Sequence, residues 1–142
     1  MEEKNEDSLK ELIRSELVKT KEDIHRSIIN SVKILKEFII IEEGSGKVLI
    51  LNQKSIKNID KIILLLIGKY LAFISGILTQ PEVPLSTLEL ELGIPKTTLS
   101  GPLSSLVTQN TIKKPKENSY KINEVKIEEE VNRICNFKNV KN

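Results

Sequence analysis

Apolar positions recur at helical spacing along the first forty residues. They fall three, four or seven residues apart, which places them along one stripe of a helix from about Ser8 to Lys36. No proline or glycine interrupts this stretch, so the pattern allows one continuous helix or two helices that meet near Thr20 and Lys21. The members of the stripe are Leu9, Leu12, Ile13, Leu17, Ile24, Ile28, Val32 and Leu35.

The first half of this stripe, Leu9 to Leu17, lies far along the chain from the remaining apolar segments. One compact domain cannot easily bury residues placed so far from its core. We therefore expect them to pack on a second copy of the chain, which makes the protein a homodimer. The alternative is a helix that folds back on its own chain.

Two β-branched runs follow at 38–42 and 47–51, on either side of a glycine-rich turn at 43–46. This pattern predicts a β-hairpin. Both strands are apolar on both faces, so we expect both faces to be covered. The N-terminal helix is expected on one face and the next helix on the other.

The next predicted helix runs to about Leu78 and begins at Asn58 or Asp60, either of which can cap it. Its apolar run covers 62–78 but contains Lys69, whereas a membrane span needs about 20 residues without a charge. A buried helix is the better interpretation, with the Lys69 ammonium extending to the surface. The charged N-terminus lacks the apolar stretch of a signal peptide. We therefore expect a cytoplasmic protein without a membrane partner.

A short helix, a turn and a second helix are predicted over residues 85–109. Ser86 or Thr87 caps the first helix, and Gly93 supplies the left-handed residue that ends it. Leucines at spacings of three and four give each helix one buried face: Leu88 and Leu92 on the first, and Leu99, Leu103 and Leu106 on the second.

The second helix contains a proline, Pro102. An interior proline costs about 3 kcal/mol, but a proline in the first turn loses little because the N–H there has no helical partner. We therefore expect this helix over about 98–109, with Thr97 or Thr98 as its cap. Asn110 then supplies a second left-handed cap.

A β-hairpin and a final helix complete the predicted elements. The strands cover 111–114 and 120–122, and the tip covers 115–119. The last helix runs from about 124 to 137 and is followed by a frayed tail at 138–142. Its apolar positions are Val125, Ile127, Val131, Ile134 and Phe137.

These elements resemble the winged helix-turn-helix regulators of bacteria and archaea. Their pattern of apolar, glycine and threonine positions corresponds here to Leu88, Leu92-Gly93-Ile94, Thr98-Leu99, Leu103, Leu106 and Asn110-Thr111-Ile112. The segment from Lys61 to Ala72 looks like the first helix of that domain, so the resemblance covers about half the chain. Glu89 departs from the pattern, because a small alanine usually stands there.

The resemblance implies a mainly α fold with small β elements, of the α+β class. Residues 58–137 are then the winged helix-turn-helix domain, and residues 1–57 are a helix and hairpin that form the dimerisation region. The net charge of +2 is small, but residues 93–126 carry six lysines against two glutamates. The positive excess therefore falls on the part of the chain that would face duplex DNA.

The resemblance further implies that helix 98–109 lies on DNA and that the wing, 113–121, holds its backbone. The outward helix positions carry hydroxyls instead of the arginine that makes a bidentate contact with guanine, so we expect salt-sensitive binding with modest sequence preference. The candidate contacts are Lys96, Thr97, Ser100, Gly101, Ser104, Ser105, Thr108, Gln109, Lys113, Lys114, Lys116 and Lys121.

Catalytic and metal-binding functions find no support in the sequence. Cys135 and His25 are the single residues of their types, and we expect a half-buried thiol and a surface histidine. No cofactor is implied, and no constellation of residues predicts an enzyme. The expected function is a homodimeric transcriptional regulator that binds double-stranded DNA. The alternative is a protein–protein interaction module, a non-catalytic subunit of a larger assembly.

Overall fold

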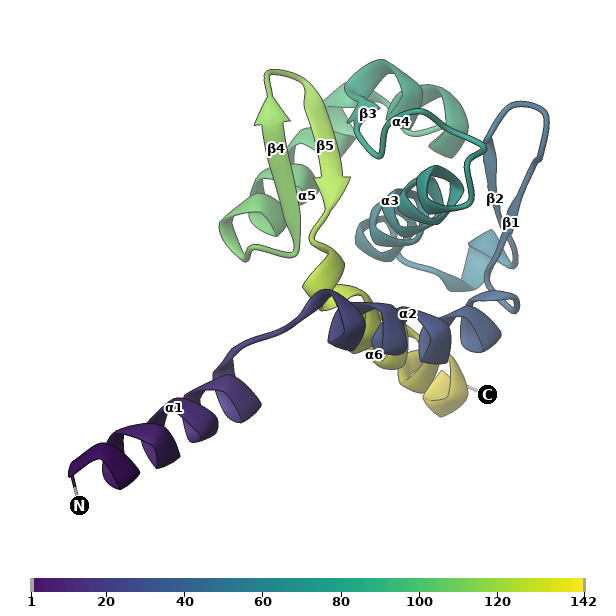
Figure 1. Ribbon diagram of the computed structural model, residues 1–142. Helices are drawn as coiled ribbons and strands as arrows, with labels where there is room; N and C mark the ends of the chain where they lie inside the picture. The colour runs from purple at the N-terminus through teal and green to yellow at the C-terminus, as the bar shows by residue number, and fades with distance from the viewer. Residues whose placement is uncertain (1, 142) are drawn as a thin grey trace.

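The computed structural model describes the backbone of residues 2–141 and the side chains of residues 6–136. Within this range the protein is mainly helical with two small antiparallel sheets, which confirms the α+β class (Figure 1). Two short 3-10 turns, η1 and η2, lie before α3 and α6. The elements are α1 (Glu2–Leu17), α2 (Lys21–Leu35), β1 (Ile39–Ile41), β2 (Val48–Ile50), η1 (Gln53–Ser55), α3 (Asn58–Ile74), β3 (Val83–Pro84), α4 (Leu85–Leu92), α5 (Lys96–Thr108), β4 (Ile112–Lys116), β5 (Ser119–Ile122), η2 (Glu124–Lys126) and α6 (Ile127–Lys141).

The N-terminal stripe forms two helices, α1 and α2, not one rod. Thr20 separates them with a capping box, in which its Oγ1 accepts from the Asp23 N–H and its own N–H donates to the Asp23 carboxylate, both at 3.1 Å. These bonds hold the pKa of Asp23 below its ordinary value. Helix α1 projects away from the rest of the chain (Figure 1), so it does not fold back on the body. The exposed fractions are 56% for Leu9 and 76% for Leu17.

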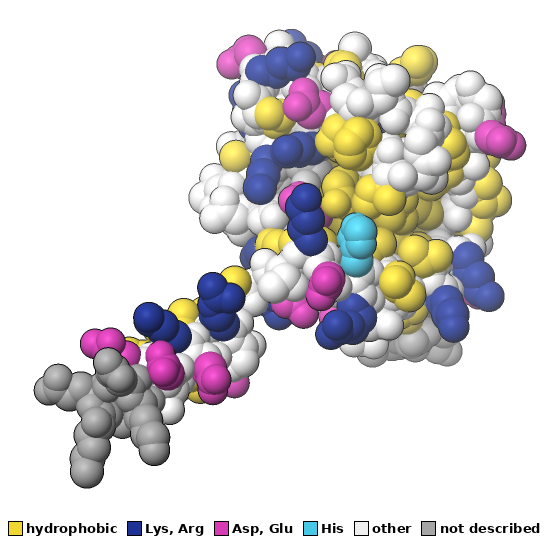
Figure 2. All heavy atoms as spheres, in the orientation of Figure 1, with side chains coloured by type: hydrophobic (Ala, Val, Ile, Leu, Met, Phe, Trp, Pro, Cys, Tyr) yellow, Lys and Arg dark blue, Asp and Glu magenta, His cyan; other side chains and the backbone are white. Residues whose placement is uncertain are grey.

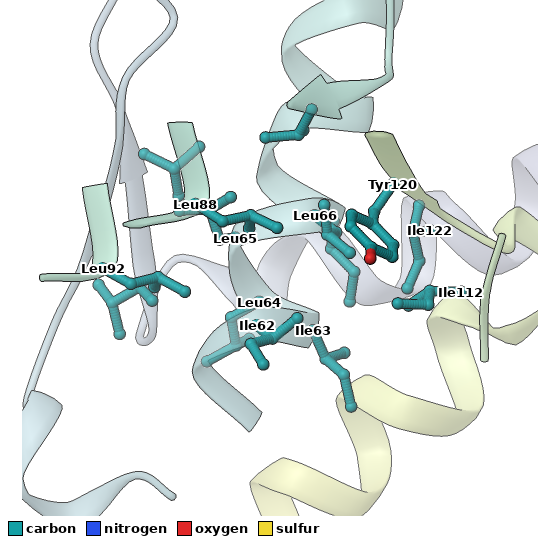
Figure 3. Packing of buried hydrophobic residues seen from close by; sticks show 14 of the residues in the cluster. Ile62, Ile63, Leu64, Leu65, Leu66, Leu88, Leu92, Ile112, Tyr120 and Ile122 are labelled. Atoms are coloured by element: carbon teal, nitrogen blue, oxygen red, sulfur yellow. The ribbon is translucent and has the colours of Figure 1, made fainter. Parts of the chain in front are cut away.

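The centre of the core is α3, whose residues 62–67 are each no more than 1% exposed (Figure 3). Its neighbours are the β1–β2 hairpin, β5, α4, α5 and α6. The core is continuous across residue 57, because Leu35 and Val48 belong to the same cluster as α3. At Gly68 a Cβ atom would lie 2.8 Å from the methyl carbons of Val48, so only glycine allows the hairpin to pack this closely.

Both predicted ends of α3 are wrong. The cap is Lys57, which makes no side-chain capping bond, and Asn58 and Asp60 lie inside the helix. The Asp60 carboxylate instead accepts a bond of 2.7 Å from Arg133 of α6. The helix ends at Ile74 and not near Leu78, because Gly76 adopts a left-handed φ of 88° and the following N–H groups turn back to the Ala72 carbonyl.

Lys69 does not reach the surface, contrary to the prediction, and its residue is only 6% exposed. Its ammonium donates to Glu91 Oε2 at 2.7 Å and to the Gly46 carbonyl at 3.0 Å. The other oxygen of Glu91 accepts from the Val48 N–H at 3.0 Å. The hairpin turn and α4 therefore cover the lysine and supply its counter-ion, which joins three elements at one point.

The β1–β2 hairpin is confirmed, and its register pairs Ile39 with Ile50 and Ile40 with Leu49. Ile39 and Ile50 are buried toward α3, as the prediction requires for one face. The other face is open, since Ile40 is 51% and Leu49 is 42% exposed. The expectation that both faces are covered is therefore wrong for a single copy of the chain, because α2 packs against α6 instead.

Helix α4 leads through a short turn into α5. Its cap is Pro84, so the predicted caps Ser86 and Thr87 lie inside the helix. The chain enters α4 directly from β3, and the Leu85 N–H donates to the Asn118 carbonyl at 2.8 Å. Gly93 ends the helix with a φ of 67°, which confirms the predicted left-handed residue. Leu88 and Leu92 are buried, also as predicted.

The C-terminal helix, α6, packs against α2 and extends to Lys141. It continues beyond the predicted end at 137, through most of the tail expected to fray; the side chains from Phe137 onward, and Asn142, lie outside the described residues. Val125 precedes the helix in η2 and is 49% exposed, so it is not one of the buried positions.

None of the helices among the described residues is long and apolar enough to cross a membrane.

The ion pair of Lys69 and Glu91 yields a stability prediction. The Glu91→Ala substitution should lower the free energy of unfolding by about 3–5 kcal/mol, because it leaves a buried ammonium without its counter-ion. Urea denaturation measures this. Glu89→Ala is the matched control on the same helix, and the double variant Lys69→Met, Glu91→Leu should cost less than Glu91→Ala alone. A cost for Glu91→Ala no larger than for Glu89→Ala would contradict the assignment.

Candidate nucleic-acid interface

Helix α5 carries most of the candidate contacts and begins at Lys96, two residues before the predicted start at 98. Its cap is Pro95, whose φ of −62° and ψ of 148° are the extended conformation of a cap position. Thr97 and Thr98 therefore lie inside the helix, and neither is the cap. The inward face agrees with the prediction: Leu99, Leu103 and Leu106 are each at most 2% exposed.

Pro102 lies in the interior of α5, contrary to its predicted place in the first turn, because the helix starts earlier. A proline here has no N–H to donate to the carbonyl of Thr98, one turn before it. It also crowds the Cβ atom of the preceding residue when that residue is helical. The preceding residue is Gly101, which has no Cβ, and a Cβ there would meet nothing within 4 Å apart from its chain neighbours and the adjacent backbone of α5. The glycine is therefore explained by its neighbouring proline.

The hydroxyl groups of α5 differ in what they still offer to a ligand. The hydroxyls of Ser100 and Thr108 donate to the carbonyls of Thr97 and Ser104 at 3.3 and 3.0 Å, which leaves them as acceptors toward an outside group. The amide of Gln109 donates to Ser105 at 3.5 Å, and the Ser105 hydroxyl keeps its own proton for donation. Because phosphate oxygens only accept hydrogen bonds, the Ser105 hydroxyl can donate to a phosphate, whereas the Ser100 and Thr108 hydroxyls, as bonded here, can accept only from a donor such as a base amino group.

The β4–β5 hairpin follows α5, after the predicted left-handed Asn110 with a φ of 62°. The turn itself is only Glu117 and Asn118, shorter than the predicted tip at 115–119. Pro115 is tolerated in β4 because this strand lies at the edge of the sheet, whose order is β3-β5-β4.

Four lysines of the hairpin were candidate contacts, and two of them lie directly opposite one another. Lys113 of β4 pairs in register with Lys121 of β5. Like charges in this position are destabilising unless an anion lies nearby. Lys114 and Lys116 are held loosely, at 3.5 Å from Glu117 and 4.0 Å from Glu82. Exposed pairs of this kind contribute little, so both lysines remain able to contact phosphates.

A groove of about 350 Å³ lies between α5 and the β4–β5 hairpin. Five of the twelve candidate residues line it: Lys96, Ser100, Ser104, Thr108 and Lys114. The remaining candidates lie outside it: Thr97, Gly101, Ser105, Gln109, Lys113, Lys116 and Lys121. Sequence reasoning missed the floor and the far rim, which are Leu85, Leu103, Val107, Asn118 and Tyr120. The Lys114 ammonium lies 5.8 Å from the centre of the Tyr120 ring.

The sequence analysis also made predictions about the single cysteine, the single histidine and metal binding. Cys135 is partly buried and His25 is exposed, both as expected. Among the described residues, no three His, Cys, Asp or Glu side chains are grouped so that they could hold a metal ion.

Gly101 and Pro102 should be coupled in stability. In the natural chain, Gly101→Ala should destabilise by about 1 kcal/mol or more, because the new Cβ meets the proline ring. In the Pro102→Ala background the same change should stabilise by about 1 kcal/mol, the usual gain of alanine over glycine in a helix. Urea denaturation of the four proteins tests this. A stabilising Gly101→Ala in both backgrounds would show that the proline does not require the glycine.

Comparisons with protein-family models, with curated proteins and with solved structures find no match for this chain. The function must therefore be inferred from the residues of the interface and from their arrangement.

Proposed function

We propose that residues 58–137 form a winged helix-turn-helix domain that binds duplex DNA, with α5 as the recognition helix and the β4–β5 hairpin as the wing. Three features support this. The chain order α3, β3, α4, α5, β4, β5 suits such a domain, the short turn after α4 contains a left-handed Gly93, and β5 lies between β3 and β4.

The observation that carries the proposal is the placement of cations on the wing. Lys113 and Lys121 pair directly with each other across the hairpin, so neither of them has an acid as its register partner. Lys114 and Lys96 add charge on the side of the hairpin that faces the groove, and Lys116 adds charge near the turn. Figure 2 shows dark blue side chains gathered over this hairpin. A polyanion such as the phosphate backbone removes the repulsion between these lysines.

We expect the protein to contact mainly the phosphate backbone of DNA and to show only a weak preference for base sequence. Helix α5 has no arginine, and Gln109, the one amide side chain between residues 96 and 109, is bonded to Ser105. Lysines mainly contact phosphates, which fix position without reading bases. This favours a transcriptional regulator with modest sequence preference.

The homodimer is part of this proposal, with α1 as its interface. Four leucines and isoleucines of α1 are 41–76% exposed, namely Leu9, Leu12, Ile13 and Leu17. A helix with an uncovered apolar face is stabilised by packing against a second one. A two-fold dimer presents two recognition helices to successive turns of DNA, about 34 Å apart.

The second candidate function is a protein-binding module in a larger assembly. One specific observation favours it: Leu90 on α4 is 82% exposed, and the open face of the β1–β2 hairpin adds Ile40 and Leu49. Exposed apolar residues of this kind are typical of protein contacts when they are grouped. Absence of DNA binding would favour this function over the first.

DNA binding should depend on salt through the wing lysines. In fluorescence anisotropy titrations at low and at moderate salt, affinity should fall with salt, and Lys113→Gln or Lys116→Gln should each reduce the logarithmic salt slope by about 1. Lys47→Gln, in the β1–β2 hairpin away from the wing, is the control and should change nothing. No binding to duplex DNA at low salt would contradict the proposed function.

The dimer should depend on the apolar face of α1. Sedimentation equilibrium should give twice the chain mass for the natural protein, and the double variant Leu9→Glu, Ile13→Glu should be a monomer because charges replace the contact. Glu11→Lys alters the opposite, polar face of α1 and should leave the dimer intact. A dimer that survives the double variant would assign the interface elsewhere, and a monomeric natural protein would exclude it.

A further inference from the structure

We propose that the groove between α5 and the β4–β5 hairpin binds one unpaired nucleotide of a DNA strand. The base would lie on the apolar floor, and a phosphate would lie between Lys96 and Lys114. This inference rests on the proposed DNA-binding function and adds to it a contact with an unpaired base.

The floor of the groove is apolar and firmly placed. Leu103 is 1% exposed, and Leu85 and Tyr120 are nearly buried at 8% and 7%. The volume of about 350 Å³ is at the small end of ligand pockets, which span roughly 300–1,000 Å³. A single base with its sugar suits a space of this size. The partly buried Val107 would be its main apolar support, because Leu85, Leu103 and Tyr120 are almost fully buried and close the bottom of the groove.

The rim of the groove selects for an anion. Lys96 stands at the start of α5 and Lys114 stands on β4, and no carboxylate lines the groove. The three other pockets described among these residues each contain at least one acid, such as Glu128, Glu91 or Glu89. Glu117 lies 3.5 Å from the Lys114 ammonium but does not line the groove, and charge complementarity therefore favours a phosphate-bearing occupant here over the other three pockets.

The polar groups of the groove suit the edge of a base. Ser104 has no side-chain hydrogen bond among the described residues, and Asn118 at the turn offers both a donor and an acceptor. Thr108 already donates to the Ser104 carbonyl and offers only an acceptor. Three groups with different capacities surround the floor, which allows several bases to bind with little preference.

A base pair within B-form DNA cannot enter this groove. Its bases are stacked, so only their edges face a protein, whereas a base that enters the groove must leave the stack. An overhang, a frayed end or a single strand supplies such a base at a cost of little or no unpairing. The groove thus distinguishes unpaired from paired DNA.

Two adjacent serines on α5 provide the matched variants. Ser104 lines the groove and Ser105 does not, although both are exposed. Ser104→Trp should fill the groove, whereas Ser105→Trp should leave it open. Anisotropy titrations would compare a blunt duplex with the same duplex bearing a short oligothymidine overhang. The natural protein should bind the overhang duplex about tenfold more tightly, the effect of one stacked base.

Ser104→Trp should abolish the preference for the overhang, and Ser105→Trp should retain it. The readout is the ratio of overhang to blunt affinity within each variant, because both serines lie on the proposed recognition helix. The double variant Lys96→Gln, Lys114→Gln should likewise weaken overhang binding more than blunt binding, without adding bulk to α5. Unfolding midpoints in urea would verify that each variant is folded.

Equal affinity of the natural protein for blunt and overhang duplexes would overturn the groove proposal and leave duplex binding in place. Equal loss of the preference in both tryptophan variants would overturn it as well. Absence of binding to either DNA at low salt would instead remove the proposed function itself, and the groove proposal with it.

Discussion

Helix α3 is apolar on every side, and this single constraint determines how the other elements are arranged. Residues 62–67 are at most 1% exposed, so the hairpin, α4, α5, β5 and α6 must all contact one rod. Each fully buried aliphatic side chain contributes roughly 1.5–3 kcal/mol relative to an exposed one. Helix α3 packs against both α5 and β5. This common contact sets the spacing of α5 and the β4–β5 hairpin, and the groove lies between them.

Apolar burial alone does not determine how far one element slides on another, because it has no direction. The ion pair of Lys69 and Glu91 adds direction at the end of α3 that the hairpin turn covers. One ammonium contacts α4 and the Gly46 carbonyl, and the same glutamate holds the Val48 N–H. Partners at fixed distances therefore specify the position of the hairpin as well as its burial.

The sequence predicted features that a few neighbouring residues encode. Gly93 and Asn110 are left-handed because each ends a helix locally, and the leucines of α5 follow its period. Helix caps were mispredicted because backbone geometry at Lys57, Pro84 and Pro95 replaced the expected side-chain caps. The pair of Lys69 and Glu91, and the floor of the groove, join residues far apart in the chain, and no local pattern reveals them. The DNA contacts and the winged helix remain predictions.

Helix α5 and the β4–β5 hairpin present different chemical groups at the candidate interface. Helix α5 contains Gly101 and Pro102, which weaken a helix, and its outward groups are small and mostly neutral. The hairpin concentrates charge, including two lysines opposite one another. An interface built to read base edges would place arginine or free amides on the helix. Here the charge lies on the strands and the space lies beside the helix, so in the proposed DNA complex the hairpin would supply affinity and the groove would supply shape discrimination.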